Sequence, residues 1–163
     1  MQKTNKIRLI FLIVLLGIGF NWPLAVNSAE KGSEIEKIKK MKEKDLTIQA
    51  KQVFEKKYAG ENWEQYKFPK FVYTNEAVLI GYKIAVKESL LLAKFKCYCF
   101  CEEMGHKNLA YCFLEEGRPE GKFDDHAATC NICYTQAMRA FLWRELGMKD
   151  EEISKAMAET YEK

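Results

Sequence analysis

All six cysteines and both histidines of this 163-residue chain lie within one stretch of 37 residues. A fold that accommodates such a stretch must bring these groups together, pair the thiols, or keep them apart. The expected functions depend on which of these it does. The eight residues are Cys97, Cys99, Cys101, His106, Cys112, His126, Cys130 and Cys133.

The segment "DDHAATCNIC" places a histidine and two cysteines at spacings of four and three residues. In a helix these steps correspond to about 40° and 60° of rotation, so the three side chains would share one face. We expect one long helix from about Asp125, capped by Asp124 or Asp125, to Leu146. The chain then offers two clusters, with Cys112 and His106 able to complete either. The clusters are Cys97/Cys99/Cys101 and His126/Cys130/Cys133.

Thiolate and imidazole ligands suit zinc, copper(I) or an iron–sulfur centre, and they do not suit calcium or magnesium. Zinc takes four ligands in a tetrahedron, so eight candidates could form two sites or one cluster of several ions with bridging sulfurs. We favour copper(I) or zinc and rank an iron–sulfur centre below them. Met104 could add a soft ligand. A c-type haem is excluded because Tyr134 occupies the position of its axial histidine.

Two other interpretations of the cysteines stay open. Six cysteines in an exported protein could form three disulfides and staple an interaction module. Alternatively, "CNIC" at a helix start could support thiol–disulfide redox chemistry, because the helix dipole would stabilise the thiolate of Cys130 beside Cys133. In redox proteins of that type a strand normally precedes the motif, and none is indicated here. Whether the chain is an enzyme is left open.

The N-terminus has the pattern of an export signal. Three basic residues precede the apolar run Leu9–Phe20, and Pro23 is followed by small residues near a cleavage point after Ser28 or Ala29. The run is short for a membrane span, which needs roughly twenty residues. We therefore predict a signal peptide in residues 1–29, with an uncleaved anchor as the alternative. The protein would act in the periplasm, at the cell envelope or outside the cell.

The charge balance argues against nucleic-acid binding. Of the 26 basic residues, three lie in residues 1–29, and all 23 acidic residues lie beyond them. The part left after cleavage is therefore neutral, and the basic character of the whole chain belongs to the signal. We expect contact with the membrane only through that segment, if it stays uncleaved.

The pattern of apolar residues predicts a small all-α domain. Residues 30–45 are highly charged and indicate a spacer helix with a thin apolar face. Residues 46–163 indicate a Cys/His-rich domain of four to five helices, because alternation typical of strands is nowhere sustained. The helices that we expect lie near residues 46–58, 76–85, 105–115, 125–146 and 151–161.

Several motifs resemble those of a known group. "CYCFC", "HKNLAYCF", the spaced "H...C.IC" before a helix and the final "EEISKAMAETY" are together similar to bacterial exported proteins named for a PCYCGC or CYCxC motif. Some of these are lipoproteins and some are selenoproteins. The resemblance covers roughly residues 68–161. In this chain the motif reads KCYCFC, so Lys96 stands in place of the proline and Phe100 in place of the glycine.

The resemblance implies an envelope-located, helical, cysteine-rich domain and no particular reaction. Its selenoprotein branch favours redox or soft-metal chemistry over passive disulfides. No cysteine lies in the first ninety residues, so a lipid-modified cysteine at the cleavage point is excluded. We expect an exported, non-catalytic carrier or sensor of a soft metal ion, with all eight Cys and His residues as candidate ligands and another envelope protein as a partner. Of the two histidines, His126 is the favoured ligand, because His106 lies at the start of its expected helix.

Overall fold

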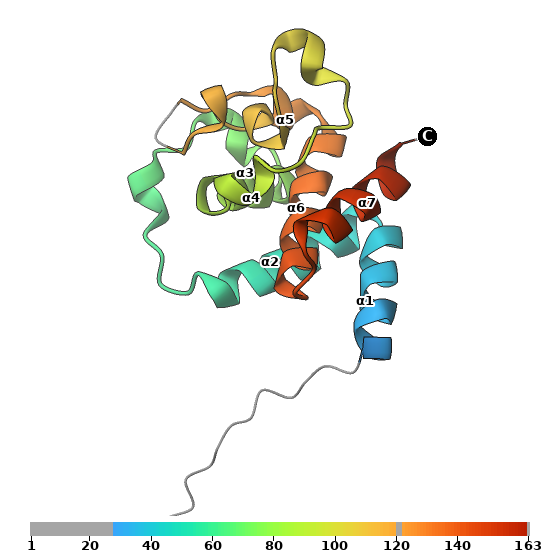
Figure 1. The fold of residues 1–163 in the computed structure, drawn as a ribbon. Helices are drawn as coiled ribbons and strands as arrows, with labels where there is room; N and C mark the ends of the chain where they lie inside the picture. Colours follow the sequence, from blue (N-terminus) through green and yellow to red (C-terminus); the bar gives the residue numbers. More distant parts are fainter. Residues whose placement is uncertain (1–27, 120–121, 163) are drawn as a thin grey trace, which may run out of the picture.

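The computed structural model describes residues 28–119 and 122–162, and this part of the chain is helical (Figure 1). The all-α prediction is confirmed: among the described residues there is no strand beyond one isolated bridge between Leu114 and Phe123. The α-helices are α1 (Ser28–Lys40), α2 (Glu43–Lys57), α3 (Glu76–Lys87), α4 (Ser89–Leu92), α5 (His126–Thr129), α6 (Asn131–Glu145) and α7 (Asp150–Tyr161). Short 3-10 helices are η1 (Trp63–Tyr66), η2 (Lys70–Tyr73), η3 (Cys101–Met104), η4 (Leu109–Cys112) and η5 (Glu115–Gly117).

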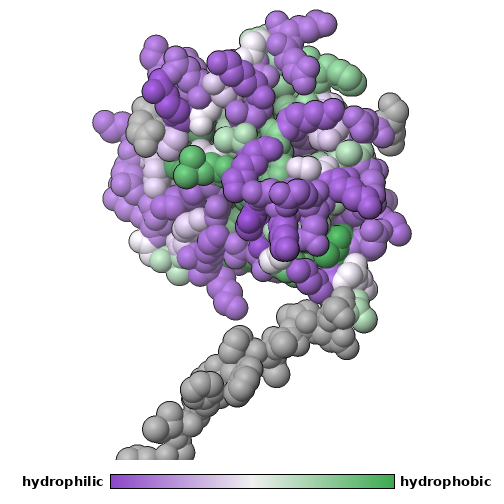
Figure 2. Space-filling view, viewed as in Figure 1, coloured by the Kyte–Doolittle hydropathy of each residue, from purple (hydrophilic) through white to green (hydrophobic). Residues whose placement is uncertain are grey.

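The predicted signal segment, residues 1–29, lies almost wholly outside the described residues, so its prediction stays untested. None of the described helices combines the length and apolarity that crossing a membrane requires. The face of the molecule seen in Figure 2 is largely hydrophilic, with only scattered apolar residues.

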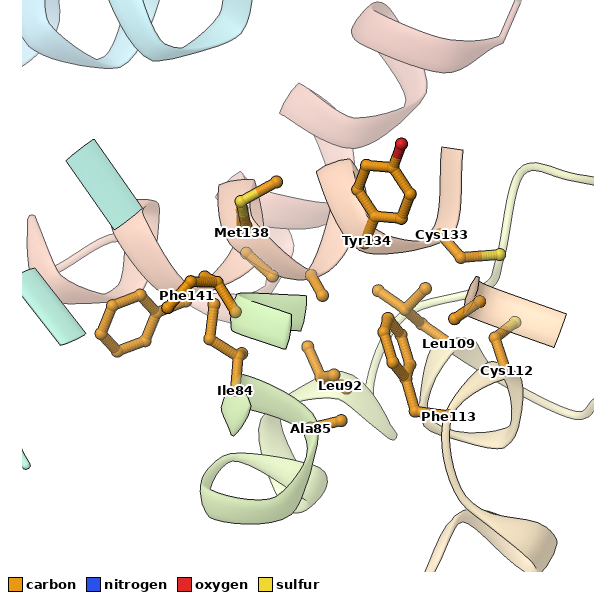
Figure 3. Close-up of a cluster of buried hydrophobic side chains, with 14 of the residues drawn as sticks. Ile84, Ala85, Leu92, Leu109, Cys112, Phe113, Cys133, Tyr134, Met138 and Phe141 are labelled. Atoms are coloured by element: carbon orange, nitrogen blue, oxygen red, sulfur yellow. The ribbon is translucent and has the colours of Figure 1, made fainter. Parts of the chain in front are cut away.

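Helix α6 forms the centre of the domain. Helices α1, α2, α3, α4, α5 and α7 all pack against it. Every residue from Cys133 to Trp143 is buried, on all sides of the helix. A helix that is surrounded in this way needs no polar face, which explains why α6 lacks the one-sided pattern of a surface helix. The buried side chains around it continue to Cys112 and Cys133, so the cysteines lie at one end of the core (Figure 3).

Arg139 is the one cation among the buried residues of α6, and it joins three helices. Its Nε and Nη2 atoms donate to the carbonyls of Ile38 (3.2 Å) and Met41 (2.7 Å), at and just beyond the end of α1. Its Nη1 atom donates to the hydroxyl of Tyr161 in α7 (2.6 Å). Carbonyls at a helix C-terminus lack partners and carry partial negative charge, so a buried guanidinium is well accommodated there.

The charged segment 30–45 is mostly helical, as α1 and the start of α2, and it packs onto the domain. Ile38 is fully buried, and the indole Nε1 of Trp143 donates to the carbonyl of Ile35 (3.4 Å). Only a few apolar residues hold α1 in place, and hydrogen bonds to its carbonyls add to them.

Two helices differ from the sequence prediction. The long helix expected over residues 125–146 is broken at Cys130, which is extended (φ −115°, ψ 104°) between α5 and α6. Thr129, Cys130 and Asn131 are all weak helix formers, which favours a break there. The helix expected over residues 105–115 is only the single turn η4, because Gly105 has a positive φ and Asn108 is extended.

Gly81 of α3 allows close contact with α6 next to Cys133. A Cβ atom at this position would lie 2.7 Å from the Cβ of Tyr134 and 3.2 Å from a ring carbon of Phe113. We predict that Gly81→Ala destabilises the fold by about 1–3 kcal/mol, because both neighbours are buried parts of the core. Urea denaturation followed by circular dichroism measures this change.

The matched control is Gly32→Ala in α1, where a Cβ would have no atom within 4 Å. It should leave stability unchanged or raise it slightly, since alanine favours helix. Equal stability of the Gly81→Ala variant and the native protein would contradict the prediction.

Candidate metal centre

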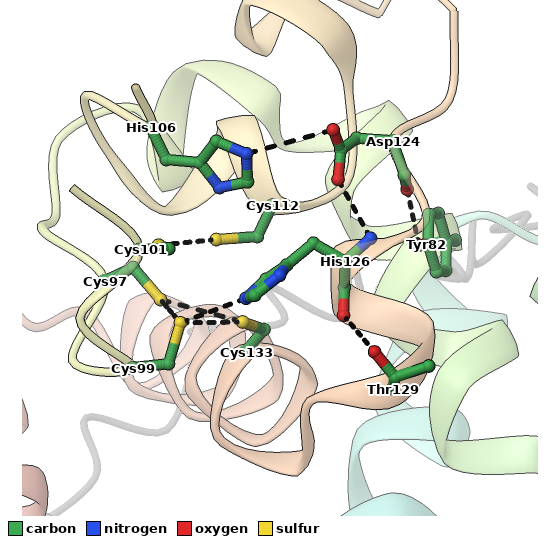
Figure 4. A network of polar contacts seen from close by, with 10 residues as sticks. All are labelled: Tyr82, Cys97, Cys99, Cys101, His106, Cys112, Asp124, His126, Thr129 and Cys133. Atoms are coloured by element: carbon green, nitrogen blue, oxygen red, sulfur yellow. Dashed lines mark hydrogen bonds and ion pairs between the residues drawn. The ribbon is translucent and has the colours of Figure 1, made fainter. Parts of the chain in front are cut away.

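Three segments that are distant in sequence meet at the end of the core (Figure 4). The first is the loop of residues 96–101, the second is η4, and the third is the junction of α5 and α6. Together they bring the side chains of seven of the eight candidate ligands close to one another. Those seven are Cys97, Cys99, Cys101, Cys112, His126, Cys130 and Cys133.

Backbone hydrogen bonds position the first loop. The amide of Leu109 donates to the carbonyl of Phe95 (2.8 Å), and the amide of Tyr98 donates to Oε1 of the buried Gln136 (3.4 Å). Gln136 lies in α6 one turn after Cys133, so the loop is fastened to the helix that carries that cysteine. The sequence pattern did not identify Gln136, although a buried glutamine amid apolar residues normally has a specific partner.

Phe100 turns the chain sharply between the second and third cysteines. Its backbone is left-handed (φ 61°, ψ 29°), and the turn directs Cys101 into the buried start of η3. The phenyl ring itself is 88% exposed. A side chain in this backbone conformation costs about 1–2 kcal/mol, and the exposed ring gains little from packing in return.

Side-chain caps fix the other two segments. Asn108 accepts a hydrogen bond from the amide of Ala110 (3.1 Å) and so starts η4, which ends at Cys112. Asp124 accepts from the amide of His126 (2.9 Å), while its own carbonyl accepts from the Tyr82 hydroxyl (2.6 Å). Because of these bonds, the His126 ring is directed towards the thiols.

The sulfur atoms are in mutual contact. The Sγ atoms of Cys97, Cys99 and Cys133 form a triangle with sides of 3.2, 3.5 and 3.6 Å. Cys99 also lies 3.2 Å from Nε2 of His126. The Cys101 and Cys112 sulfurs are 3.5 Å apart on the adjoining side. All six cysteines are free thiols in this structure.

The cluster can hold a metal ion. Three groups of four donors have all their donor atoms within 4.8 Å of one another. The sulfurs of a tetrahedral zinc site, with Zn–S bonds of about 2.3 Å, lie about 3.8 Å apart, so these groups have the right size. The groups are Cys97/Cys99/Cys112/Cys133, Cys99/Cys101/Cys112/His126 and Cys99/His126/Cys130/Cys133.

His106 belongs to none of these groups in the described part of the chain. Its ring meets that of His126 edge to face, with centroids 5.3 Å apart, and its Nε2 is 3.8 Å from Oδ2 of Asp124. It therefore contacts His126 and Asp124 without joining a group of four donors. Met104, the auxiliary ligand suggested by the sequence, has a side chain that is 56% exposed.

The thiols influence one another's ionisation strongly. Hydrogen bonds from Cys112 and Cys133 hold the pKa of Cys97 far below its usual value. Burial, together with the neighbouring Cys97, raises the pKa of Cys99. At the partly exposed edge, the thiol and amide of Cys133 lower the pKa of Cys130 to about 5. Some thiols thus ionise at the expense of others, and a bound cation would allow all of them to ionise.

A family model described as "Protein of unknown function with PCYCGC motif" matches residues 25–163. The chain belongs to the PCYCGC family. No curated protein and no solved structure matches it. The match to the family model therefore includes α1, whereas the motifs noted in the sequence cover only about residues 68–161. In this PCYCGC protein the six residues of the motif read Lys96-Cys97-Tyr98-Cys99-Phe100-Cys101, and the glycine of the motif corresponds to the left-handed Phe100.

We predict that Phe100→Gly stabilises the metal-free PCYCGC protein by roughly 0.5–1 kcal/mol. Glycine removes the steric cost of the left-handed backbone, and the larger backbone entropy that glycine loses on folding offsets only part of this gain. Phe100→Ala keeps the Cβ atom and should leave stability close to that of the native chain. Chemical denaturation of the three reduced proteins measures the difference. An equal gain from both substitutions would show that the ring, and not the backbone, is responsible.

Proposed function

We propose that this protein binds a soft metal ion as an exported, non-catalytic carrier or sensor. The observation that carries the proposal is the contact of Cys99 with two thiols and one imidazole, at 3.2–3.5 Å, inside groups of four donors. Thiols gathered for disulfides alone would not require the directed ring of His126.

Zinc and copper(I) are the ions that we propose, with zinc first. One group offers four thiolates and the other two offer three thiolates with one imidazole, and both kinds of donor set are typical of structural zinc sites. Copper(I) is equally soft, so a thiolate-rich group also suits it. Either ion would keep the thiols reduced in an oxidising compartment, because a sulfur that is bound to a metal is less available for disulfide formation.

Elemental analysis of anaerobically purified protein, combined with thiol counting, tests this proposal. We expect at least one equivalent of zinc or copper, and six thiols after the metal is removed under denaturing conditions. Less than one equivalent of any transition metal would contradict the proposal. Three disulfides in the same sample would favour the stapled interaction module instead.

Substitution of the central sulfur provides a second measurement. Cys99→Ser should weaken zinc binding by about a hundredfold or more, since each ligand of a four-donor site contributes on the order of 3 kcal/mol. Met104→Ala removes a nearby but exposed sulfur and should leave the affinity unchanged. Competition with a chromophoric chelator measures both affinities.

A thiol–disulfide function is the second candidate, and the start of α6 favours it. Cys130 is partly exposed and precedes the first turn of a fifteen-residue helix, while Cys133 is buried one turn later. Helix amides and the Cys133 thiol stabilise a thiolate at Cys130. An exposed attacking thiol with a buried resolving thiol is the arrangement that disulfide exchange requires.

The reactivity of Cys130 separates the two functions. In the reduced, metal-free protein, the alkylation rate of Cys130 should be constant above about pH 6 and fall tenfold per pH unit well below pH 5, because only the thiolate reacts and its pKa is about 5. Peptide mass spectrometry after short exposure to iodoacetamide measures this rate. Zinc should suppress the reaction if Cys130 is a ligand. Unchanged reactivity in the presence of zinc would favour the redox function.

A further inference from the structure

The three four-donor groups overlap in a way that limits how they can be occupied. Cys99 belongs to all three, and every two groups share two donors. Two ions can share a donor only if that atom bridges them. A thiolate sulfur can bridge two ions, whereas the single nitrogen that His126 offers cannot. The second and third groups share His126 and therefore cannot both be filled.

Two pairs of groups remain, and both contain the four-thiol group Cys97/Cys99/Cys112/Cys133. In one pair the shared atoms are the sulfurs of Cys99 and Cys133, which are in direct contact at 3.5 Å. This distance is close to the tetrahedral edge of about 3.8 Å expected for zinc and sulfur. Cys97 and Cys112 then complete one tetrahedron, and His126 and Cys130 complete the other, so two tetrahedra share one edge.

The other pair would use Cys101 and leave Cys130 without an ion. Cys101 is 1% exposed and touches the fully buried Cys112. A buried neutral thiol behaves as a small apolar side chain and costs little when it binds nothing. Cys130 is partly exposed, and leaving it free would leave a reactive thiol at the surface. Burial therefore favours the pair that shares Cys99 and Cys133.

We propose that the centre holds two ions, bridged by the sulfurs of Cys99 and Cys133, and that one of the two is exchanged with partners. This inference rests on the proposed metal-binding function. The inner ion has the terminal ligands Cys97 and Cys112, both buried. The outer ion has His126 and Cys130, both partly exposed. An incoming ligand can reach the outer ion without opening the core, so the outer ion is the one that a carrier would deliver.

Binding is balanced by proton release. Each of the five thiols loses its proton to the solvent as a metal–sulfur bond forms, and His126 binds through its neutral nitrogen. Two divalent ions then face five thiolates, and the net charge of the filled centre is one negative unit. No oxidant or reductant takes part in the step.

Titration of the reduced full-length protein with zinc or cadmium-113 tests the proposal. We expect two equivalents to bind, and the cadmium protein should give two NMR signals that are coupled to each other through the shared sulfurs. A chelator of moderate strength should remove one equivalent quickly and the second slowly. One equivalent in the native protein would overturn the two-ion centre and leave metal binding intact. No bound metal at all would overturn the proposed function itself.

Three variants locate the ions. Cys130→Ser should bind one equivalent, and that ion should be the slowly removed one. Cys97→Ser tests the opposite side and should weaken the slowly removed ion. Cys101→Ser distinguishes the two pairs of groups: Cys101 is a ligand only in the pair that the proposal rejects, so this variant should still bind two equivalents. A Cys101→Ser protein that binds one equivalent, or a helical Cys130→Ser protein that binds two, would overturn the assignment.

X-ray absorption on the native zinc protein gives a result that does not depend on the folding of any variant. Edge-sharing tetrahedra place the two ions close together, so a zinc–zinc contribution should appear in addition to the sulfur shell. Two bound equivalents without that contribution would show separate sites and overturn the bridge.

Discussion

The arrangement of this protein depends on one electrostatic constraint: several thiols in contact at the end of a core cannot all carry charge unless a cation lies among them. At an effective dielectric constant of about 20, two like charges 4 Å apart repel by roughly 4 kcal/mol. Sulfur atoms 3.2–3.6 Å apart are closer still. Without a metal ion this repulsion separates the pKa values of neighbouring thiols: the pKa of Cys97 is lowered and the pKa of Cys99 is raised. The bonds of Gln136, Asn108 and Asp124 hold the thiols in place in spite of it.

Much of this arrangement could be predicted from the sequence, because it follows from spacing. The steps from His126 to Cys130 and Cys133 predict convergence, and the structure brings these groups together even though the helix breaks. The break itself was not predicted. The spacing of His126, Cys130 and Cys133 favours one continuous helix, while the extended conformation of Cys130 depends on weak local preferences and on the neighbouring segments.

Other features could not be predicted, for physical reasons. Residues 30–45 contain few apolar side chains, and α1 is fixed by the buried Ile38 together with hydrogen bonds from Arg139 and Trp143 to carbonyls in α1 and just beyond its end. Side-chain patterns do not reveal bonds to the backbone. By contrast, the helical spacing of His126 with Cys130 and Cys133 already favours it over His106 in the sequence, and in the structure His126 is the histidine that lies within the groups of four donors.

The hydrogen bonds of Arg139 also fix the position of α1 on the domain. Because α1 packs against α6 and α7, the described chain begins at a fixed place on the domain. Figure 1 shows the start of α1 at one end of the molecule and α5 near the other. The sulfur-rich end thus lies remote from the start of α1. A partner that binds the cluster therefore need not contact the beginning of α1.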